Sequence, residues 1–259
     1  MRNRLRARLA SGETCANGWL SLPCAYSSEL MARAGWDSLT VDLQHGVQDY
    51  ASLVQCFQGA APWTSTPLAR VPTNETGIIG KVLDAGAWGV ICPMVNSAEE
   101  ARAFTQACYY APRGSRSNGP NRAAAYGEPD APYQSFANDE VLAIPMIETV
   151  RALEALDAIL DVPGVSGVYV GPSDLSLTMG YAPAFDRREQ EILDAYLRIV
   201  QATAARGQFA GIHCISPDYG RLMAEMGFRF ITIASDASLM ATAARDCLSR
   251  FRADGGATG

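Results

Sequence analysis

Runs of apolar, often β-branched residues alternate along the chain with longer segments in which apolar residues recur at helical spacing. Such runs are typical of strands buried on both faces of a parallel sheet, and the longer segments are typical of the helices that cover it. We therefore predict that strands and helices alternate. The predicted strands span residues 17–23, 38–44, 66–71, 88–94, 141–148, 167–170, 209–214 and 229–234.

Residues that start and stop helices lie between these runs. Asp49 can cap the helix after the second run, and Ser97 with Glu100 offers a capping box for the helix that ends near Cys108. Gly86 is suited to close the helix before the fourth run, because glycine readily adopts the left-handed conformation at a helix end. Further helices are predicted at residues 27–34, 75–85 and 186–206 and, after the last run, up to about residue 251.

The alternation of strands and helices predicts an α/β fold of the (β/α)8 TIM barrel type. A doubly wound open sheet would show the same alternation, but the glycine-rich nucleotide-binding motif that follows its first strand is absent from the sequence. We expect one barrel domain over residues 1–252 and a disordered tail over residues 253–259. The arginines near the N-terminus are spaced as in a short amphipathic surface helix.

Composition narrows the functional class. The net charge of −6, without a basic stripe, argues against nucleic acid as a partner. No apolar run approaches the roughly 18 residues that a membrane span needs, and the N-terminus lacks the apolar core of a signal peptide. The seven cysteines form no C-x-x-C pair and are expected to be reduced, buried thiols. We expect a cytoplasmic protein that binds no membrane.

The scarcity of lysine and histidine excludes two kinds of chemistry. Lys81 is the only lysine and lies in a predicted helix rather than at a strand end, which argues against a Schiff-base mechanism. With only His45 and His213, one chain cannot build a site of three histidines. A metal ion would therefore be held by oxygen ligands, which suit Mg²⁺ or Mn²⁺.

Four polar residues lie where predicted strands end: His45, Arg70, Glu148 and Asp174. Barrel enzymes place their chemistry at the carboxyl ends of the strands, so these side chains are expected to converge. Two carboxylates can hold a cation, an arginine can hold a negative oxygen, and a histidine can move a proton. Together they suit the stabilisation of an enolate.

Each of the four also has a structural interpretation. Glu148 and Asp174 could favour the start of the following helix, because acids are stabilised there. His45 could be structural, and Arg70 needs a partner that is either a protein carboxylate or a substrate carboxylate. The sequence leaves these alternatives open.

Three other positions bear on the predicted site. Asp84, in the third helix, could reach His45 and raise its basicity, or it could form a surface ion pair. Free N–H groups near Ser173, where a helix starts, could bind a carboxylate, although a plain turn would look the same. His213 lies within an apolar run and is expected to be a satisfied core or near-site histidine.

The motifs around these residues resemble those of the metal-dependent class II pyruvate aldolases, the 4-hydroxy-2-oxo-heptanedioate aldolase and citrate lyase beta family. The matches occur in the expected order and cover most of residues 15–240. The matching segments are residues 41–46, 69–72, 81–86, 92–95, 146–149 and 167–176.

The resemblance implies a barrel that exchanges its last helix with a neighbouring subunit in a homo-oligomer, usually a hexamer or else a trimer. It implies a divalent ion, Mg²⁺ or Mn²⁺ and also Co²⁺, on Glu148 and Asp174. The substrate would lie along Gly171, Pro172 and Ser173, with the Ser173 N–H on its carboxylate.

The resemblance also implies the chemistry. Arg70 would stabilise the enolate, and His45, supported by Asp84, would serve as the acid–base group. The reaction would be the reversible cleavage of a 4-hydroxy-2-oxo acid into an aldehyde and pyruvate, or a close analogue such as hydroxypyruvate. An acyl-CoA lyase of the citrate lyase beta type and a non-catalytic ketoacid-binding protein are the alternatives.

Three features depart from the family pattern. Gln44 stands where a glutamate often precedes the histidine, which removes a charge beside the base. Met146 stands where a glutamine commonly contacts the substrate, so Met146 is retained as a substrate-binding position without that hydrogen bond. The long segment 111–134, which carries Arg113, Arg116 and Arg122, is expected to contact the aldehyde side of the substrate or to be a solvated loop.

Overall fold

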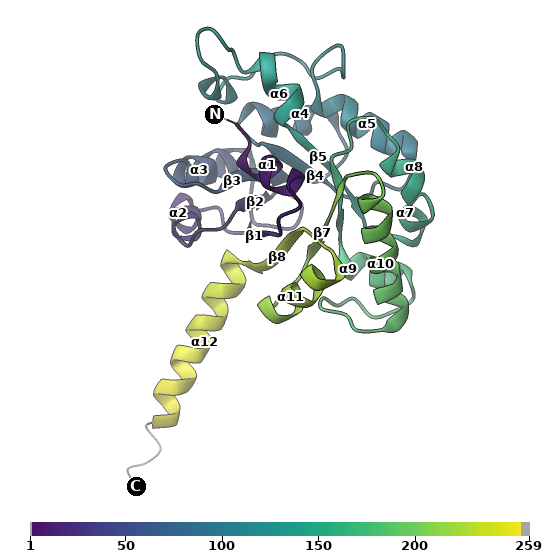
Figure 1. The fold of residues 1–259 in the computed structure, drawn as a ribbon. Coiled ribbons are helices and arrows are strands. Elements are labelled where there is room, and N and C mark those ends of the chain that lie inside the picture. Colours follow the sequence, from purple (N-terminus) through teal and green to yellow (C-terminus); the bar gives the residue numbers. More distant parts are fainter. Residues whose placement is uncertain (1, 255–259) are drawn as a thin grey trace.

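The structure, a computed structural model, describes residues 2–254 and shows a closed barrel of parallel strands in sequence order (Figure 1). The predicted barrel is confirmed. The strands are β1 (Cys15–Leu20), β2 (Ser38–Asp42), β3 (Thr66–Arg70), β4 (Gly89–Cys92), β5 (Leu142–Ile147), β6 (Gly167–Val170), β7 (Phe209–His213) and β8 (Phe230–Ser235).

Helices surround the barrel, and those whose ends were predicted from the sequence begin and end within about four residues of the predicted positions. They are α1 (Arg4–Ala10), α2 (Ala25–Arg33), α3 (Tyr50–Ala60), α4 (Thr76–Asp84), α5 (Ala98–Cys108), the 3-10 helix η1 (Ala123–Tyr126), α6 (Gln134–Glu140), α7 (Val150–Glu154), α8 (Leu156–Leu160), α9 (Pro172–Thr178), α10 (Gln190–Ala204), α11 (Pro217–Met226) and α12 (Asp236–Asp254). Among the described residues, no helix is both long and apolar enough to cross a bilayer.

The first strand ends earlier than predicted. The N–H groups of Ser21 and Leu22 donate to the carboxylate of Asp236 instead of to a neighbouring strand, so β1 stops at Leu20. Parallel pairing of β1 with β8 closes the barrel. All strands therefore end at the same rim, where predicted active-site residues can meet.

Apolar side chains form two layers. One layer lies between the sheet and the surrounding helices. The other fills the barrel interior and includes Trp19, Tyr169 and Phe230 from the strands together with Leu5 and Leu9 from α1. The N-terminal helix is short and amphipathic, as predicted, and its apolar face closes the amino-terminal end of the barrel.

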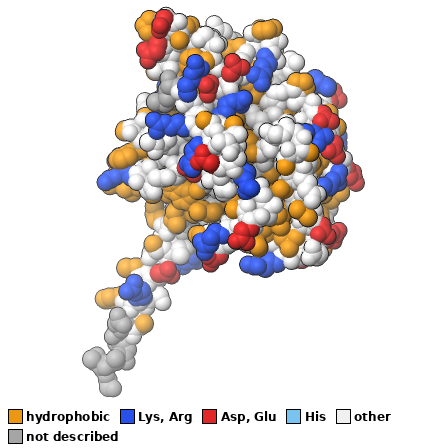
Figure 2. All heavy atoms as spheres, viewed as in Figure 1, with side chains coloured by type: hydrophobic (Ala, Val, Ile, Leu, Met, Phe, Trp, Pro, Cys, Tyr) orange, Lys and Arg blue, Asp and Glu red, His pale blue; other side chains and the backbone are white. Residues whose placement is uncertain are grey.

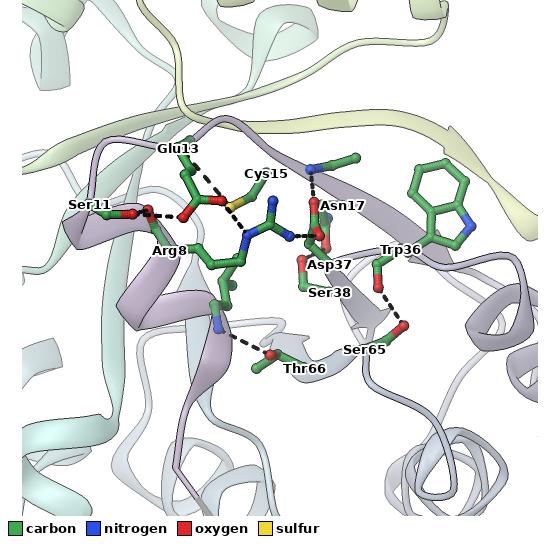
Figure 3. Close-up of polar contacts among 12 residues, drawn as sticks. Arg8, Ser11, Glu13, Cys15, Asn17, Trp36, Asp37, Ser38, Ser65 and Thr66 are labelled. Carbon is green, nitrogen blue, oxygen red and sulfur yellow. Dashed lines mark hydrogen bonds and ion pairs between the residues drawn. The ribbon is translucent and has the colours of Figure 1, made fainter.

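Polar contacts fasten α1 to this end of the barrel (Figure 3). The Arg8 guanidinium donates to Glu13 at 2.8 Å and also pairs with Asp37, which precedes β2. The N–H of Leu5 donates to the Thr66 hydroxyl at 3.3 Å. These contacts orient the helix whose leucines complete the interior layer.

The long segment after α5 also lies at the amino-terminal end. Its aromatic side chains, including Tyr133, pack on Trp88, which directly precedes β4. Arg122 donates to the carbonyl oxygen of Ala85, at the end of α4. The expected contact of segment 111–134 with the substrate is therefore not found within the chain, because the segment covers the rim opposite the strand ends.

The last helix projects away from the barrel (Figure 1). It extends to Asp254, three residues beyond the predicted end, so Ala253 and Asp254 are helical and do not belong to a tail. The rest of the predicted tail, residues 255–259, lies outside the described residues. Figure 2 shows apolar side chains gathered on the face of the barrel beside the start of α12.

Candidate active site at the barrel mouth

A cavity of about 460 Å³ opens at the carboxyl ends of the strands. Five of the predicted site residues line it directly: His45, Arg70, Glu148, Ser173 and Asp174. The predicted substrate-binding positions Met146, Gly171 and Pro172 line it too. The structure thus brings together every predicted site residue except Asp84.

Asp42, which we did not predict, is the most connected residue of the site. Its buried carboxylate accepts two hydrogen bonds from the Arg70 guanidinium, at 2.8 and 2.7 Å, and one from the Trp19 indole at 3.1 Å. The N–H groups of Gln44 and His45 donate to it as well. Burial alone would raise the pKa of this carboxyl, but the hydrogen bonds and charge of Arg70 outweigh burial and lower it.

Sheet register explains this pair and offers a signal that could have predicted it. Asp42 and Arg70 are the last residues of β2 and β3 and are register partners. An acid and a base at matched ends of neighbouring strands lie side by side. The partner of Arg70, left open by the sequence, is therefore a protein carboxylate, and the guanidinium also lies 4.9 Å from the centre of the Trp19 ring.

Glu148 directly follows β5 and its side chain is buried. The Met94 N–H donates to Oε1 at 2.6 Å, and Oε2 lies so close to Gly171 that a β-carbon there would be 2.5 Å away. Burial raises the pKa of Glu148 to about 7, the Met94 N–H opposes that rise, and the charge of Asp174 adds to it. Thr149 caps α7 instead, so Glu148 is not the cap of that helix.

Asp174 lies in the first turn of α9 and lines the same cavity as Glu148. No N–H or O–H group in the described part of the chain donates to its carboxylate. The described residues contain no group of three or more His, Cys, Asp or Glu side chains that could hold a metal ion. Two carboxylates with free oxygens fit an ion such as Mg²⁺, which often binds one or two carboxylates and takes its other ligands from water and substrate.

The loop after β4 holds Glu148 at the expense of backbone strain. Met94 has φ 56°, a left-handed conformation that is unfavourable for a side chain of this size. Asn96 donates to the carbonyl oxygen of Met94 at 2.8 Å and accepts from the Thr149 hydroxyl. These contacts hold the Met94 N–H toward the Glu148 carboxylate.

His45 lies in an exposed loop at the edge of the cavity. Asp84 does not support it: the Asp84 carboxylate accepts from Arg116 at 2.7 Å. The two residues are separated because α4 ends at the rim opposite the cavity, where Arg116 is buried among aromatic rings. The predicted interaction between His45 and Asp84 is therefore wrong within one chain.

Two of the three departures from the family pattern, Gln44 and Met146, lie at or beside the cavity. Gln44 has a buried side-chain oxygen without a hydrogen-bond partner in residues 2–254. Met146 is buried, and its terminal methyl group lies 2.9 Å from the position that a β-carbon on Gly171 would take. Met146 therefore lines the cavity without the hydrogen bond of a glutamine, and Gln44 precedes His45 without the charge of a glutamate.

His213 closes the remaining side of the cavity, as a near-site histidine. Its ring lies edge-on to Trp19, with centroids 4.7 Å apart, and its Nδ1 is 3.2 Å from the Tyr169 hydroxyl. Burial, and next the positive charge of Arg70, lower the pKa of His213 to about 3. Trp19 and Phe185, which also line this side, were not predicted from the sequence.

Comparison with known proteins identifies relatives of the whole chain. A family model described as HpcH/HpaI aldolase/citrate lyase matches residues 18–243. The chain is 36% identical over 252 residues to the hydroxypyruvate/pyruvate aldolase of Rhizorhabdus wittichii, covering 97% of this chain and 99% of that protein. It is 34% identical over 253 residues to the 2-keto-3-deoxy-L-rhamnonate aldolase of Escherichia coli, covering 96% and 93%.

A solved structure from the same family has the same fold as this chain. The HpcH/HpaI aldolase/citrate lyase family protein from Burkholderia cenocepacia superimposes with a TM-score of 0.89 at 30% sequence identity. The alignment covers 96% of this chain and 99% of that one. The similarity therefore extends over the barrel and the cavity alike.

The lowered pKa of His213 predicts a specific pH dependence of stability. Between its unfolded value near 6.5 and about 3, the unfolded state binds a proton that the folded state does not, so stability falls as pH falls. We expect the wild type to lose up to about 1.4 kcal/mol per pH unit below pH 6.5 relative to His213→Phe. The free energies of unfolding of both proteins are measured with urea from pH 7 to pH 5. The contributions of other titrating groups cancel in their difference. A constant difference would contradict the shift.

Proposed function

The chain belongs to the HpcH/HpaI aldolase/citrate lyase family, and we propose that it is a metal-dependent aldolase that acts on 4-hydroxy-2-oxo acids. It is a lyase of the aldolase type. In the proposed reaction the substrate is cleaved reversibly into an aldehyde and pyruvate or hydroxypyruvate. One observation carries the proposal: two carboxylates with free oxygens, Glu148 and Asp174, share a cavity with the fixed cation of Arg70.

Divalent-metal dependence is a property of the family, and Glu148 and Asp174 are the residues that would hold the ion here. Mg²⁺ or Mn²⁺ suits an all-oxygen site best, and Co²⁺ is the alternative. A divalent ion supplies Lewis acidity, which draws electrons from a ketoacid's oxygens and acidifies the carbon beside its carbonyl group. The raised pKa of Glu148 supports this role, because a cation would stabilise a carboxylate that is destabilised mainly by burial and to a lesser extent by the charge of Asp174.

The surrounding residues would bind the ketoacid and take up its charge. The guanidinium of Arg70, fixed by Asp42, would stabilise the negative charge that develops on the keto oxygen. Ser173 is the second residue of α9, where backbone N–H groups lack partners inside the helix, so its N–H would donate to the substrate carboxylate. Gly171 and Pro172 would form the floor beneath it.

His45 would move the proton between the aldol hydroxyl group and solvent. His45 and His213 both line the cavity, but only His45 is exposed. Gly46 lets the loop fold back tightly, because a β-carbon there would lie 2.4 Å from the Asp42 carbonyl oxygen. Two N–H bonds to Asp42 therefore fix the loop that presents His45.

Removal of the metal ion tests this function. We expect that stripping divalent ions with a chelator abolishes pyruvate release from a panel of 4-hydroxy-2-oxo acids, and that Mg²⁺ or Mn²⁺ restores it. Glu148→Gln should lower kcat/KM by at least roughly 1000-fold, because one of two charged ligands is lost. Coupling pyruvate to a dehydrogenase measures the rate.

Glu154→Gln is the matched control, since Glu154 is exposed on α7 and does not line the cavity. Activity that survives complete metal removal would contradict the metal-dependent mechanism. Binding of ketoacids without turnover of any substrate would support a non-catalytic binding protein instead.

We propose in addition that α12 packs on a neighbouring subunit in a homo-oligomer, a hexamer or a trimer. The helix lies apart from its own barrel and exposes Leu239, Met240, Leu248 and Phe251 (Figure 1). Exposed apolar side chains on one element mark a surface that another element covers. The apolar face beside the start of α12 supports the same conclusion (Figure 2).

Substitutions on the exposed apolar side chains of α12 should dissociate the oligomer. We expect Leu248→Asp with Phe251→Asp to shift the mass toward that of the monomer, because charged groups cannot be buried at low cost in an apolar contact. Light scattering coupled to size-exclusion chromatography measures the mass. Leu197→Asp, which alters an exposed leucine of α10, is the control. A monomeric wild type would overturn the proposal.

A further inference from the structure

A line of buried hydrogen bonds crosses the barrel interior and ends at His213. It starts at Asn17, which contacts the hydroxyls of Ser38 and Thr40 on β2 (Ser38 in Figure 3). It continues through Thr232 on β8 and the hydroxyl of Tyr169 on β6. Tyr169 then contacts Nδ1 of His213. All members before His213 are fully buried, so each must satisfy its polar groups inside this line.

The donors and acceptors can be assigned along the line. The Asn17 side-chain oxygen accepts from both β2 hydroxyls, at 2.8 and 3.0 Å, and its amide nitrogen donates to the Thr232 hydroxyl at 2.8 Å. Thr232 then has a proton to donate, and the Tyr169 oxygen lies 2.6 Å away. Tyr169 in turn donates to Nδ1 of His213, at 3.2 Å.

The opposite direction leaves a group unsatisfied. If Nδ1 of His213 donated to Tyr169 and Tyr169 to Thr232, the Thr232 proton would have no acceptor among the described residues. A buried hydroxyl without an acceptor costs roughly 1–3 kcal/mol. The first direction is therefore favoured, and it places the ring proton of the neutral His213 on Nε2.

Nε2 is the end of the line that reaches the cavity. It forms no hydrogen bond with a described residue, and it is not among the buried polar atoms that lack a partner. Trp19 and Phe185 flank the ring, with centroids 4.7 and 5.3 Å from that of His213. An N–H donor therefore stands between two aromatic side chains of the cavity lining, which also contains Arg70.

The charge state decides what this donor can recognise. The neutral ring beside the Arg70 cation offers a directed dipole and no full charge, in keeping with its lowered pKa. Such a donor suits a neutral oxygen more than a carboxylate or phosphate. A hydroxyl group of the substrate supplies such a neutral oxygen.

We propose that His213 is a specificity-determining residue whose Nε2–H donates to a substrate hydroxyl group on the carbon next to a carbonyl. The inference rests on the proposed aldolase function and adds a preference for hydroxylated substrates over alkyl isosteres. The hydroxyl can belong to the ketoacid, as in hydroxypyruvate, or to the aldehyde, as in glycolaldehyde. Both present the same chemistry to Nε2.

Two pairs of isosteric substrates test the preference. Hydroxypyruvate is compared with 2-oxobutyrate as the ketoacid, and glycolaldehyde with propanal as the aldehyde. We expect the wild type to favour the hydroxylated member of at least one pair in kcat/KM. His213→Phe should reduce that ratio roughly 10-fold, the value of one lost hydrogen bond. The pair that responds identifies which substrate carries the hydroxyl. Unchanged ratios for both pairs would overturn the proposal.

Two tyrosine variants separate positioning from packing. Tyr169→Phe removes the donor that fixes the tautomer of His213, so the ratio should fall without any change in the residue that meets the substrate. Tyr196→Phe removes a buried hydroxyl that has no hydrogen-bond partner in the described chain, and it should leave the ratio unchanged. If both variants behave alike, the line of hydrogen bonds does not position His213.

Nitrogen NMR tests the tautomer independently of activity. The chain has only two histidines, so ¹⁵N-labelled protein and a His45→Asn variant assign both rings. We expect His213 to carry its proton on Nε2 and not to titrate between pH 5 and 8. Hydroxypyruvate should shift the Nε2 resonance more than 2-oxobutyrate does, even if no turnover is found. Protonation on Nδ1, or titration near pH 6.5, would overturn the inference whether or not the aldolase function holds.

Discussion

The carboxylate of Asp42 holds together the groups on which the cavity depends. It fixes the Arg70 guanidinium through two hydrogen bonds, orients Trp19, and anchors the loop of His45. A buried carboxylate is stable only when it is paired and hydrogen-bonded, and here all of its partners are parts of the site. A preorganised cation of this kind can stabilise developing charge without rearrangement during the reaction.

The barrel supplies the geometry that the pair requires. Strands that run parallel and close on themselves bring their ends to one rim, so residues far apart in sequence share one cavity. Glu148 and Asp174 meet in this way, with Met94 and Gly171 shaped around them. The opposite rim is closed by α1 and segment 111–134. Their apolar contacts stabilise the barrel, and these segments do not line the cavity.

Residues at strand ends were predictable because hydrophobic periodicity locates strands, and the barrel rule then locates their ends. His45, Arg70, Glu148 and Asp174 all follow from that reasoning. Asp42 was predictable in principle from the register of β2 and β3. What sequence could not supply was the direction of side chains on helices and loops. Asp84 was expected either to reach His45 or to form an ion pair, and the resemblance favoured His45. Its helix ends at the far rim, where Asp84 pairs with Arg116.

The buried line of hydrogen bonds from Asn17 to His213 could not be predicted from the sequence either. Its members lie on β1, β6, β7 and β8 and become neighbours only when the barrel closes. Polar residues inside apolar runs give no hint of whether they pair with one another. The structure shows that they do, and of the two positions expected for His213, in the core or near the site, it shows the one near the site.

The central claim is that metal held by Glu148 and Asp174, together with Arg70, acidifies a ketoacid. The most direct measurement is hydrogen–deuterium exchange of the pyruvate methyl group in D₂O, followed by ¹H NMR, because it needs no knowledge of the aldehyde. The account predicts exchange that depends on the protein and Mg²⁺ and that stops when the metal is removed. Exchange no faster than in protein-free solution, or an unchanged rate after metal removal, would contradict it.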